Sequence, residues 1–411
     1  MNDTHYDIVI AGGGMIGTSL ALALAPLGLR IGVVEAVPRG ETAQPSFDDR
    51  STALARSTQR MYEAMGLWPD VVAAATPIRR IHVSDQGRFG FSHIDAAEQG
   101  VEALGYVVIN RVLGEVLQAA VQQQESIDVV CPASVVGVEL SASGAAVEVE
   151  SDDGSGRRLS CSLLVGADGA NSAVRGLLGI TARKHAYGQC AVIGNLAPEK
   201  HIDNVAYERF TPQGPLAILP VADERAAFVW TVSEHDAERV MALDDETFLA
   251  ELQDEFGYRL GRFSRVGKRA SYPLMLSKAL RLTATRSVLI GNAAHGLHPV
   301  SAQGFNLGMR DVAALADCVA DAQGATESFD AGDEAILRRY ADWRRSDQRK
   351  LVRFTDGLVK LFGSDRPPVG VLRNIGMLGF DLVPGVRSAF ARHTMGLAGR
   401  LPRLSRGVPV K

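Results

Sequence analysis

The 411-residue sequence predicts an α/β fold: a parallel sheet covered by helices, a mixed or antiparallel sheet inserted into it, and a C-terminal helical segment. Three short apolar runs predict the parallel sheet, because each ends in a glycine-rich or acidic turn that leads into a predicted helix. These runs are residues 6–11, 163–169 and 288–295. Alternating apolar stretches between the second and third runs predict the inserted sheet, and a helical pattern begins near Tyr340.

Composition and charge set the class of protein. Charged residues make up 22% of the chain and apolar residues 46%, which is typical of a globular protein that buries a core without disulfides or metals. The four cysteines form no C-x-x-C pair, which argues against a zinc site and fits a reducing compartment. The net charge of −4 gives no indication of nucleic-acid binding.

Residues 8–29 carry no charged side chain and are long enough to span a membrane. The segment before them contains Asp3 and Asp7 but no Lys or Arg, whereas a signal sequence begins with a basic segment. Five glycines and one proline interrupt the stretch. A strand, a tight turn and a buried helix account for these residues better than a membrane span does.

The first turn has the pattern G-x-G-x-x-G, formed by Gly12, Gly14 and Gly17, and residues 18–27 read as a helix. Gly12 permits a tight turn, Gly14 lets the backbone approach a pyrophosphate, and Gly17 allows close packing of helix and strand. The helix N-terminus offers N–H groups and a positive dipole end to phosphates. This turn therefore predicts a dinucleotide site.

A second apolar run, residues 29–34, ends at Glu35. An acid at this place can bind both hydroxyls of an adenosine ribose. The order of strand, glycines, helix, strand and acid favours a nucleotide site over a glycine-rich turn without a ligand. The pattern does not separate FAD from NAD.

Two later turns extend the prediction. Asp168 and Gly169 end the second run, and either Asn171 or Ser172 is expected to cap the helix that follows; alone, this connection fits any strand–turn–helix unit equally well. After the third run, residues 296–308 lead into a helix expected from about Met309. Glycines before that helix leave N–H groups available to an anion or to the polar edge of a ring.

Together the three turns resemble those of single-component FAD-dependent aromatic hydroxylases, the group typified by para-hydroxybenzoate hydroxylase. The third reads G-[DN]-A-A-H-x-x-x-P-x-x-x-Q-G-x-N-x-G over residues 291–308, and the resemblance covers about residues 5–395. Residues 49–54 and 355–358 resemble the ubiquinone-biosynthesis hydroxylases. Position 292 is Asn, whereas most of the wider family has Asp there. In this the sequence resembles the branch that hydroxylates 2-polyprenyl-6-methoxyphenol.

The resemblance implies a discontinuous, Rossmann-like FAD-binding domain with an inserted substrate domain. The FAD-binding domain is expected over residues 1–75, 106–182 and 281–339, the substrate domain over 76–105 and 183–280, and the C-terminal helical region over 340–411. Within the substrate domain, residues 244–256 read as a helix with its apolar side chains on one face: Phe248, Leu249, Leu252 and Phe256.

The resemblance also implies tight, non-covalent binding of FAD, with NAD(P)H as co-substrate and reductant and O2 as the source of the oxygen that a phenol receives. No second G-x-G-x-x-G unit occurs, so NAD(P)H is expected at a transient site on the same domain. No metal ligand is expected. The residues expected to bind the cofactor are Gly12, Gly14, Ile16, Gly17, Glu35, Arg50, Arg111, Asp168, Gly169, Asn292, Gly304, Phe305 and Asn306.

Two of these residues have a structural alternative. Arg50 is adjacent to Asp48 and Asp49, and a salt bridge to either would explain it without a ligand. Arg111 opens an amphipathic helix, and the less favoured alternative is a solvated residue of its first turn.

His295, Pro299 and Gln303 are expected between the flavin and the substrate. A histidine there is a candidate general base for a phenol, because its pKa lies near working pH. The alternative, which we favour, is a hydrogen-bonded loop histidine that shapes the turn. No catalytic base is assigned from the sequence.

The C-terminal residues 366–411 carry eight basic and one acidic side chain, against 35 basic and 46 acidic in the rest of the chain. A basic amphipathic tail suits an anionic membrane surface. The alternative is a helix packed on the FAD-binding domain with its arginines in water. The expected location is the cytoplasm, with contact to the inner face of the cytoplasmic membrane if the tail binds lipid.

These observations predict an FAD-dependent monooxygenase that hydroxylates a polyprenylated phenol in ubiquinone biosynthesis, with other quinone-biosynthesis proteins as candidate partners. Two alternatives stay open: a hydroxylase of a soluble aromatic substrate, and a flavin-binding assembly or redox-sensing protein without turnover.

Overall fold

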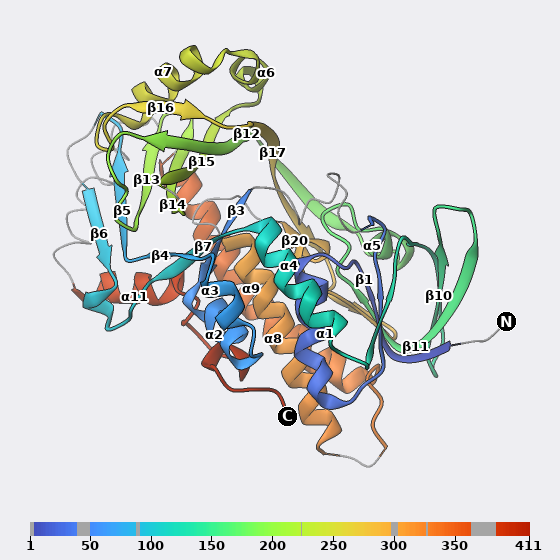
Figure 1. Ribbon diagram of the computed structural model, residues 1–411. Coiled ribbons are helices and arrows are strands. Elements are labelled where there is room, and N and C mark those ends of the chain that lie inside the picture. Colours follow the sequence, from blue (N-terminus) through green and yellow to red (C-terminus); the bar gives the residue numbers. More distant parts are fainter. Residues whose placement is uncertain are drawn as a thin grey trace.

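The computed structural model describes residues 4–38, 50–87, 91–222, 224–296, 303–325, 328–362 and 384–411. In these residues, two large sheets and one small sheet form the frame of the protein (Figure 1). The predicted α/β fold is confirmed.

The first large sheet, here called the nucleotide sheet, has the central strand order β18-β19-β11-β1-β2-β8. The pairs among β19, β11, β1, β2 and β8 are parallel, as the three apolar runs predict. An antiparallel hairpin of β9 and β10 continues from β11. The strands are β1 (Thr4–Ala11), β2 (Ile31–Val34), β8 (Ile127–Val130), β9 (Ser134–Leu140), β10 (Ala145–Glu150), β11 (Gly156–Gly166), β18 (Thr283–Ala284) and β19 (Ser287–Leu289).

Helices cover one face of the nucleotide sheet, and the β9–β10 hairpin packs on the other. Ile8 and Ile10 of β1 point to the helices, while Val9 and Ala11 contact the hairpin side. The helices of this domain are α1 (Met15–Leu24), α2 (Arg56–Ala64), α3 (Trp68–Val72), α4 (Asn110–Gln122), α5 (Ala173–Leu177), α8 (Gln303–Gln323) and α9 (Glu334–Phe362).

The second large sheet, the inserted sheet, has the order β20-β17-β12-β15-β14-β13-β5-β6, with β16 beside β12. All its pairs are antiparallel except β13 with β5, so the sheet is mixed. The strands are β5 (Arg80–Asp85), β6 (Phe91–Asp95), β12 (Ala182–Pro198), β13 (Val205–Thr211), β14 (Gly214–Val221), β15 (Arg225–Ser233), β16 (Phe263–Val266), β17 (Ala270–Ala279) and β20 (His295–Gly296).

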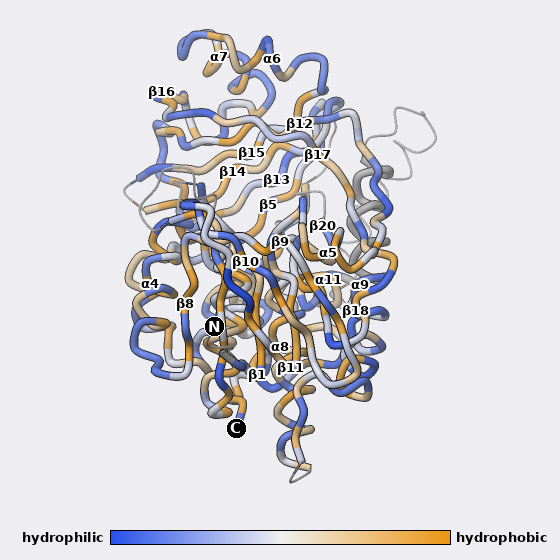
Figure 2. Tube along the Cα trace, turned by 90° about the vertical axis from the view of Figure 1, so that its right-hand side faces the viewer, coloured by the Kyte–Doolittle hydropathy of each residue, from blue (hydrophilic) through white to orange (hydrophobic). Residues whose placement is uncertain are grey.

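Two helices cover the face of the inserted sheet that points away from the nucleotide sheet, α6 (Glu234–Ala242) and α7 (Asp245–Phe256) (Figure 2). The predicted helix over 244–256 is confirmed. Asp244 caps α7 by accepting the N–H of Thr247 at 2.8 Å. The predicted apolar stripe packs on the sheet, where Phe248 contacts Phe228 and Trp230.

A small sheet of β3 (Ser51–Ala55), β7 (Gly105–Ile109) and β4 (Thr76–Ile78) joins the two domains. Its residues Ile78 and Val107 pack against Ala206, Val221 and Ala227 of the inserted sheet. The inserted sheet therefore has an inner face, which is turned toward the nucleotide domain, and an outer face under α6 and α7.

The start of α8 differs from the prediction. A helix was expected from about Met309, yet α8 begins at Gln303 and includes both Gly304 and Gly308. A Cβ on Gly308 would lie 2.8 Å from the Ile16 side chain, so glycine is needed there for close helix packing and not for a turn. Tertiary packing thus overrides the low helix propensity of glycine.

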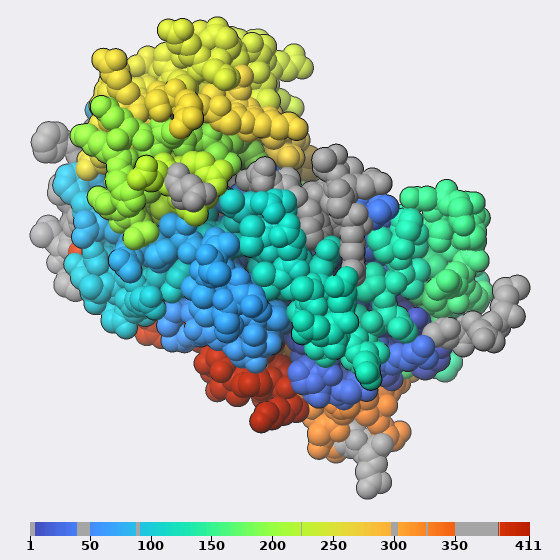
Figure 3. Space-filling view, viewed as in Figure 1, coloured from blue at the N-terminus to red at the C-terminus, as the bar shows by residue number. Residues whose placement is uncertain are grey.

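The described C-terminal residues pack on the body of the protein. They form α11 (Pro384–Thr394) and a segment that ends beside α1 and α2 (Figure 3). Leu404 and Val410 join the core of the nucleotide domain. Basic side chains have partners here: Arg387 pairs with Glu98 at 2.9 Å, and the guanidinium of Arg400 lies 4.2 Å from the Trp343 ring centroid.

This arrangement corresponds to the packing alternative for the tail over residues 384–411. Arg387, Arg400 and Arg403 have partners, and Arg392 and Arg406 are exposed. Residues 366–383 lie outside the described part of the chain. In the part of the chain that the structure describes, every helix is too short or too polar to cross a membrane.

Candidate functional site

The first turn, between β1 and α1, requires glycine at two of the predicted positions. Gly12 has φ +102°, and a Cβ on it would lie 2.6 Å from the carbonyl oxygen of Ala167, at the end of β11. A Cβ on Gly17 would lie 1.9 Å from the carbonyl oxygen of Gly12. Gly14 is the N-cap of α1 and gives it no side-chain hydrogen bond, so the first N–H groups of the helix are left for another acceptor.

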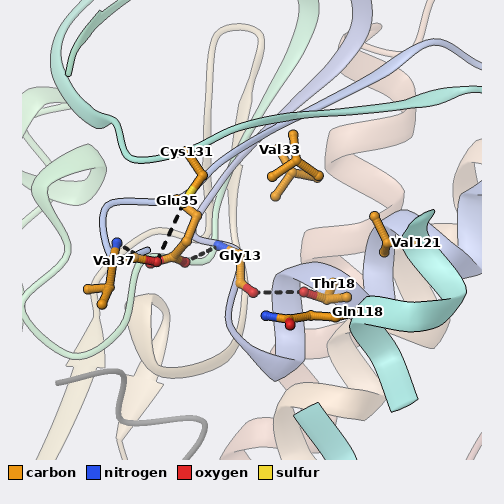
Figure 4. A pocket seen from close by; sticks show the side chains of 9 residues that line it. Gly13, Thr18, Val33, Glu35, Val37, Gln118, Val121 and Cys131 are labelled. Atoms are coloured by element: carbon orange, nitrogen blue, oxygen red, sulfur yellow. Dashed lines mark hydrogen bonds between the residues drawn. The ribbon is translucent and has the colours of Figure 1, made fainter. Parts of the chain in front are cut away.

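Glu35 lies at the end of β2 and holds this turn in place. Its carboxylate accepts the N–H of Gly13 at 2.6 Å and the N–H of Val37 at 2.9 Å (Figure 4). Each carboxylate oxygen keeps a further lone pair for a hydroxyl group. A pocket opens beside this carboxylate, and its lining residues are Gly13, Thr18, Val33, Glu35, Val37, Gln118, Val121, Val129 and Cys131.

The second turn, between β11 and α5, is built around Asp168. Its carboxylate accepts the hydroxyl of Ser172 at 2.5 Å and the N–H of Val174 at 3.0 Å. Of the two predicted caps, Ser172 is the one that caps α5, by accepting the N–H of Arg175 at 2.9 Å. Gly169, within the turn, has φ +83°. Asp168 thus shapes the turn through bonds inside it.

Arg175 connects the second turn with the third. Its buried guanidinium donates to the carbonyl oxygens of Ala170 and Ala293, both at 2.9 Å. No role was predicted for Arg175, because its bond to Ala293 joins residues far apart in the chain.

The third turn, residues 291–293, lies against the first. Gly291 has φ +57°, and a Cβ on it would lie 3.1 Å from the side chain of Ile16. Ile16 therefore fills the space between this turn and Gly308 of α8. Asn292 is exposed within the turn. The backbone N–H of Gly291 donates to the carboxylate of Asp311 at 3.0 Å.

The first turn of α8 contains three predicted cofactor residues. The side-chain oxygen of Asn306 accepts the N–H of Ala55 and the hydroxyl of Thr58, both at 2.8 Å, and its amide donates to Ala53 at 2.9 Å. These bonds leave the backbone of this turn as the part suited to a flavin ring. Gly304 has open space where a side chain would be, and Phe305 packs against the core.

His295 is buried, with only 1% of its surface exposed, and its Nε2 lies 2.5 Å from the carboxylate of Asp311. Asp311 is fully buried and also accepts from Nε of Arg344 at 2.6 Å. Burial raises the pKa of Asp311, but the charges of His295 and Arg344 outweigh it and lower that pKa to about 2. The carboxylate is therefore ionised at working pH and fixes the histidine.

This geometry corresponds to the alternative of a histidine that shapes the turn. Of the other two residues expected near the substrate, Gln303 is buried and donates to the carbonyl oxygen of Thr394 at 3.2 Å. Pro299 lies outside the described residues.

A buried charge network, which was not predicted from the sequence, extends from Asp311 to the C-terminal segment. Asp347 accepts from Arg344 at 2.5 Å and from Arg310 at 3.1 Å. Arg310 also donates to the carbonyl oxygens of Gly396 and Ala398. The network therefore joins the third turn, α8, α9 and the chain after α11.

The two predicted arginines lie in different surroundings. The guanidinium of Arg50 lies 5.0 Å from the ring centroid of Tyr272, on the inner face of the inserted sheet. The neighbouring acids of the alternative interpretation lie outside the described residues. Arg111 pairs with Glu115 at 2.9 Å, and 49% of its side chain is exposed, as expected for a solvated residue of the first turn.

The three turns meet at one edge of the nucleotide sheet, where the carboxyl ends of β1, β11 and β19 lie side by side. This edge is where parallel α/β sheets bind nucleotides. The ADP half of a dinucleotide fits this edge for three reasons. The glycine turn has no room for side chains, the N-terminus of α1 is uncapped, and an acid lies at the end of β2. The residues present therefore fit FAD.

Comparison with known proteins supports this assignment. A family model described as an FAD binding domain matches residues 5–355. The chain is 36% identical to the ubiquinone hydroxylase UbiL of Rhodospirillum rubrum, covering 99% of this chain and 94% of that protein. It is 30% identical to the 3-demethoxyubiquinol 3-hydroxylase of Escherichia coli, covering 97% of this chain and all (100%) of that protein.

Among solved structures, the fold is similar to that of the p-nitrophenol 4-monooxygenase PnpA from Pseudomonas putida. The TM-score is 0.80 at 18% identity, with 97% of this chain and 99% of the other covered. This likeness shows the fold alone. With the family match and the two relatives, we conclude that the chain belongs to the FAD-dependent aromatic hydroxylases, in the branch of the ubiquinone-biosynthesis hydroxylases, and is an FAD-dependent monooxygenase.

Proposed function

We propose that this monooxygenase uses NAD(P)H and O2 to hydroxylate a polyprenylated phenol in ubiquinone biosynthesis, and that 2-polyprenyl-6-methoxyphenol is its substrate. The observation that carries the proposal is the 36% identity, over nearly the whole chain, to a ubiquinone hydroxylase. Asn292 supports the particular substrate, because Asn at this place resembles the branch that acts on this phenol. The Escherichia coli relative is named as a 3-demethoxyubiquinol 3-hydroxylase, which makes demethoxyubiquinol the competing substrate.

The residues of the chain would divide the work as follows. Gly12, Gly14, Gly17 and Glu35 would hold the ADP half of the cofactor, and the backbone N–H groups at the start of α8 would be available to its ring. Bound FAD supplies the redox and oxygen-activating chemistry, while the protein orients it and excludes water. The inner face of the inserted sheet covers the substrate side.

The test is phenol-dependent oxidation of NAD(P)H by the purified, yellow protein. Three compounds distinguish the candidates: a short-chain 2-prenyl-6-methoxyphenol, the matching demethoxyubiquinol, and 2-methoxyphenol without a prenyl chain. We expect the prenylated methoxyphenol to stimulate oxidation most and to gain one oxygen atom by mass spectrometry.

Equal stimulation by 2-methoxyphenol would favour a hydroxylase of soluble aromatic compounds. Preference for demethoxyubiquinol would move the reaction to another ring position. Oxidation that no phenol changes would overturn the proposal. Peripheral membrane contact, a cytoplasmic location and partners in the same pathway stay predictions.

A further inference from the structure

Strand β13, the third from the β6 edge of the inserted sheet, carries a carboxyl group on its inner face. Alternation along the strand places Glu208 on the same side as Ala206, which packs against Val107 of the small sheet. Tyr207 lies on the opposite side, where its ring contacts Phe256 of α7. Glu208 is therefore directed toward the nucleotide domain and away from the covering helices.

The neighbours of Glu208 on this face are apolar. The register places it opposite Val83 of β5 and Ala217 of β14, and Ala217 is in turn opposite Val229 of β15. Among the described residues, Glu208 forms no hydrogen bond and no ion pair. Its side chain is only partly exposed, so the carboxyl is neither sealed in the core nor on the outer surface.

The charged groups that share the inner face come from other elements, of which only β5 is next to β13. Asp85 lies at the end of β5, opposite Phe210, and Arg225 lies at the start of β15. Arg50 stacks on Tyr272 of β17. Each of them has an interaction of its own. Within the described residues, none of these groups forms an ion pair with Glu208.

An unpaired carboxyl group among apolar side chains destabilises the folded protein, because burial removes its hydration and supplies no hydrogen bond or opposite charge in exchange. Such a group is explained when a ligand supplies the missing partner. The substrate of the proposed function has one group that suits a carboxylate, the phenol O–H. The prenyl chain and ring would complement the apolar neighbours.

We propose, building on the proposed function, that Glu208 is a catalytic residue that binds the phenol hydroxyl of the substrate and accepts its proton. In this step the phenol O–H bond breaks, and the proton moves to a carboxylate oxygen of Glu208. The electron pair stays on the phenol oxygen, where it makes the ring a better nucleophile toward the incoming oxygen. Nothing is oxidised or reduced in the step.

The ionisation of Glu208 suits this role. Burial raises its pKa to about 7. A phenol has a pKa of about 10 and an ordinary Glu about 4.3, so transfer to an ordinary Glu is unfavourable by about six orders of magnitude. With the raised pKa, the transfer is unfavourable by only about three orders of magnitude. General bases work best when their pKa lies near the operating pH.

The experiment compares three variants with the wild type in phenol-stimulated NAD(P)H oxidation between pH 5.5 and 9, using 2-geranyl-6-methoxyphenol. Glu208→Gln keeps the shape of the side chain and removes the base. Glu208→Asp keeps the carboxylate but shortens the side chain by one methylene group. The control is Glu238→Gln, the same exchange at an exposed position of α6. Flavin content and circular dichroism show that each variant is folded.

We expect kcat/KM of the wild type to rise with pH and level off above about pH 7. Glu208→Gln is expected to lose about 100-fold or more at pH 8 and to lose the rising limb as well. Glu208→Asp should keep the rise of kcat/KM with pH but at a lower rate, and Glu238→Gln should match the wild type.

The possible failures are distinguishable. If the wild type turns over the phenol and Glu208→Gln keeps both rate and pH limb, the role of Glu208 is refuted while the proposed function stands. If Glu208→Gln does not fold, an unchanged rate in Glu208→Asp refutes it. If no phenol stimulates the wild type, the proposed function fails and this role fails with it.

Discussion

Asp311 and Glu208 are two carboxyl groups withdrawn from bulk solvent, and they differ in the partners that surround them. Asp311, in the nucleotide domain, accepts bonds from His295, Arg344 and the backbone of Gly291. Glu208, on the inserted sheet, has none among the described residues. Their pKa values move apart accordingly, to about 2 for Asp311 and to about 7 for Glu208.

The difference separates two uses of a buried acid. A fully paired carboxylate fixes the relative position of the elements it joins, here the third turn, α8 and α9. An unpaired one weakens the fold and is retained where a ligand completes it. Neither conclusion follows from burial alone, since it is the partner set that distinguishes the two sites.

The largest effect is expected from Asp311→Ala, which leaves His295 and Arg344 buried without their common partner. Breaking a buried ion pair in this way costs about 3–5 kcal/mol in the free energy of unfolding. Urea unfolding of the purified protein at pH 7 measures it. A cost below about 1 kcal/mol would show that the network does not hold the third turn. Asp311 would then no longer serve as the example of a structural, fully paired carboxylate.

A smaller effect of opposite sign is expected from Glu208→Gln. Because folding raises the pKa of Glu208 from 4.5 to about 7, the wild type loses stability as pH rises through this range, and the variant does not. After a discount for partial exposure, the variant should be more stable by about 1–3 kcal/mol at pH 8 and equally stable at pH 4.5. Urea unfolding at both pH values measures the difference. A variant less stable than the wild type at pH 8 would mean that Glu208 has a structural partner.

The smallest effect is expected from Asp317→Asn, an intermediate case. Asp317 is buried and has one partner, Arg403, whose backbone N–H lies 3.0 Å from its carboxylate. Burial raises the pKa of Asp317 despite the lowering influence of Arg403. An amide oxygen can keep the bond to the backbone N–H, so unfolding at pH 7 should change by less than about 1 kcal/mol. A loss near that of Asp311→Ala would show that one partner suffices to make a carboxylate essential.

The parts of the fold and site that depend on local patterns could be predicted from the sequence. The G-x-G-x-x-G turn, Glu35 after the second strand and the helix over 244–256 each need only neighbouring residues. The start of α8 could not be predicted, because Gly308 is helical only by virtue of contact with Ile16 and Gly291, far away in the chain.

The roles of Asp311 and Glu208 could not be predicted either. The partners of Asp311 come from a turn before it and a helix after it, and no spacing rule joins them. In residues 205–211, Glu208 alternates with the apolar Ala206 and Phe210, so a strand would place all three on one face. That irregularity was the available signal, although parity alone does not show which face is turned inward.

The core of the nucleotide domain combines Ile8 and Ile10 of the first strand with Leu404 and Val410. During synthesis the strand and its glycine turn are made long before Leu404 and Val410, which complete their core. Contacts between such distant residues form slowly, because a long loop must close before any contact is gained. This core therefore stays incomplete until residues 404–410 have been made and have packed on the first strand.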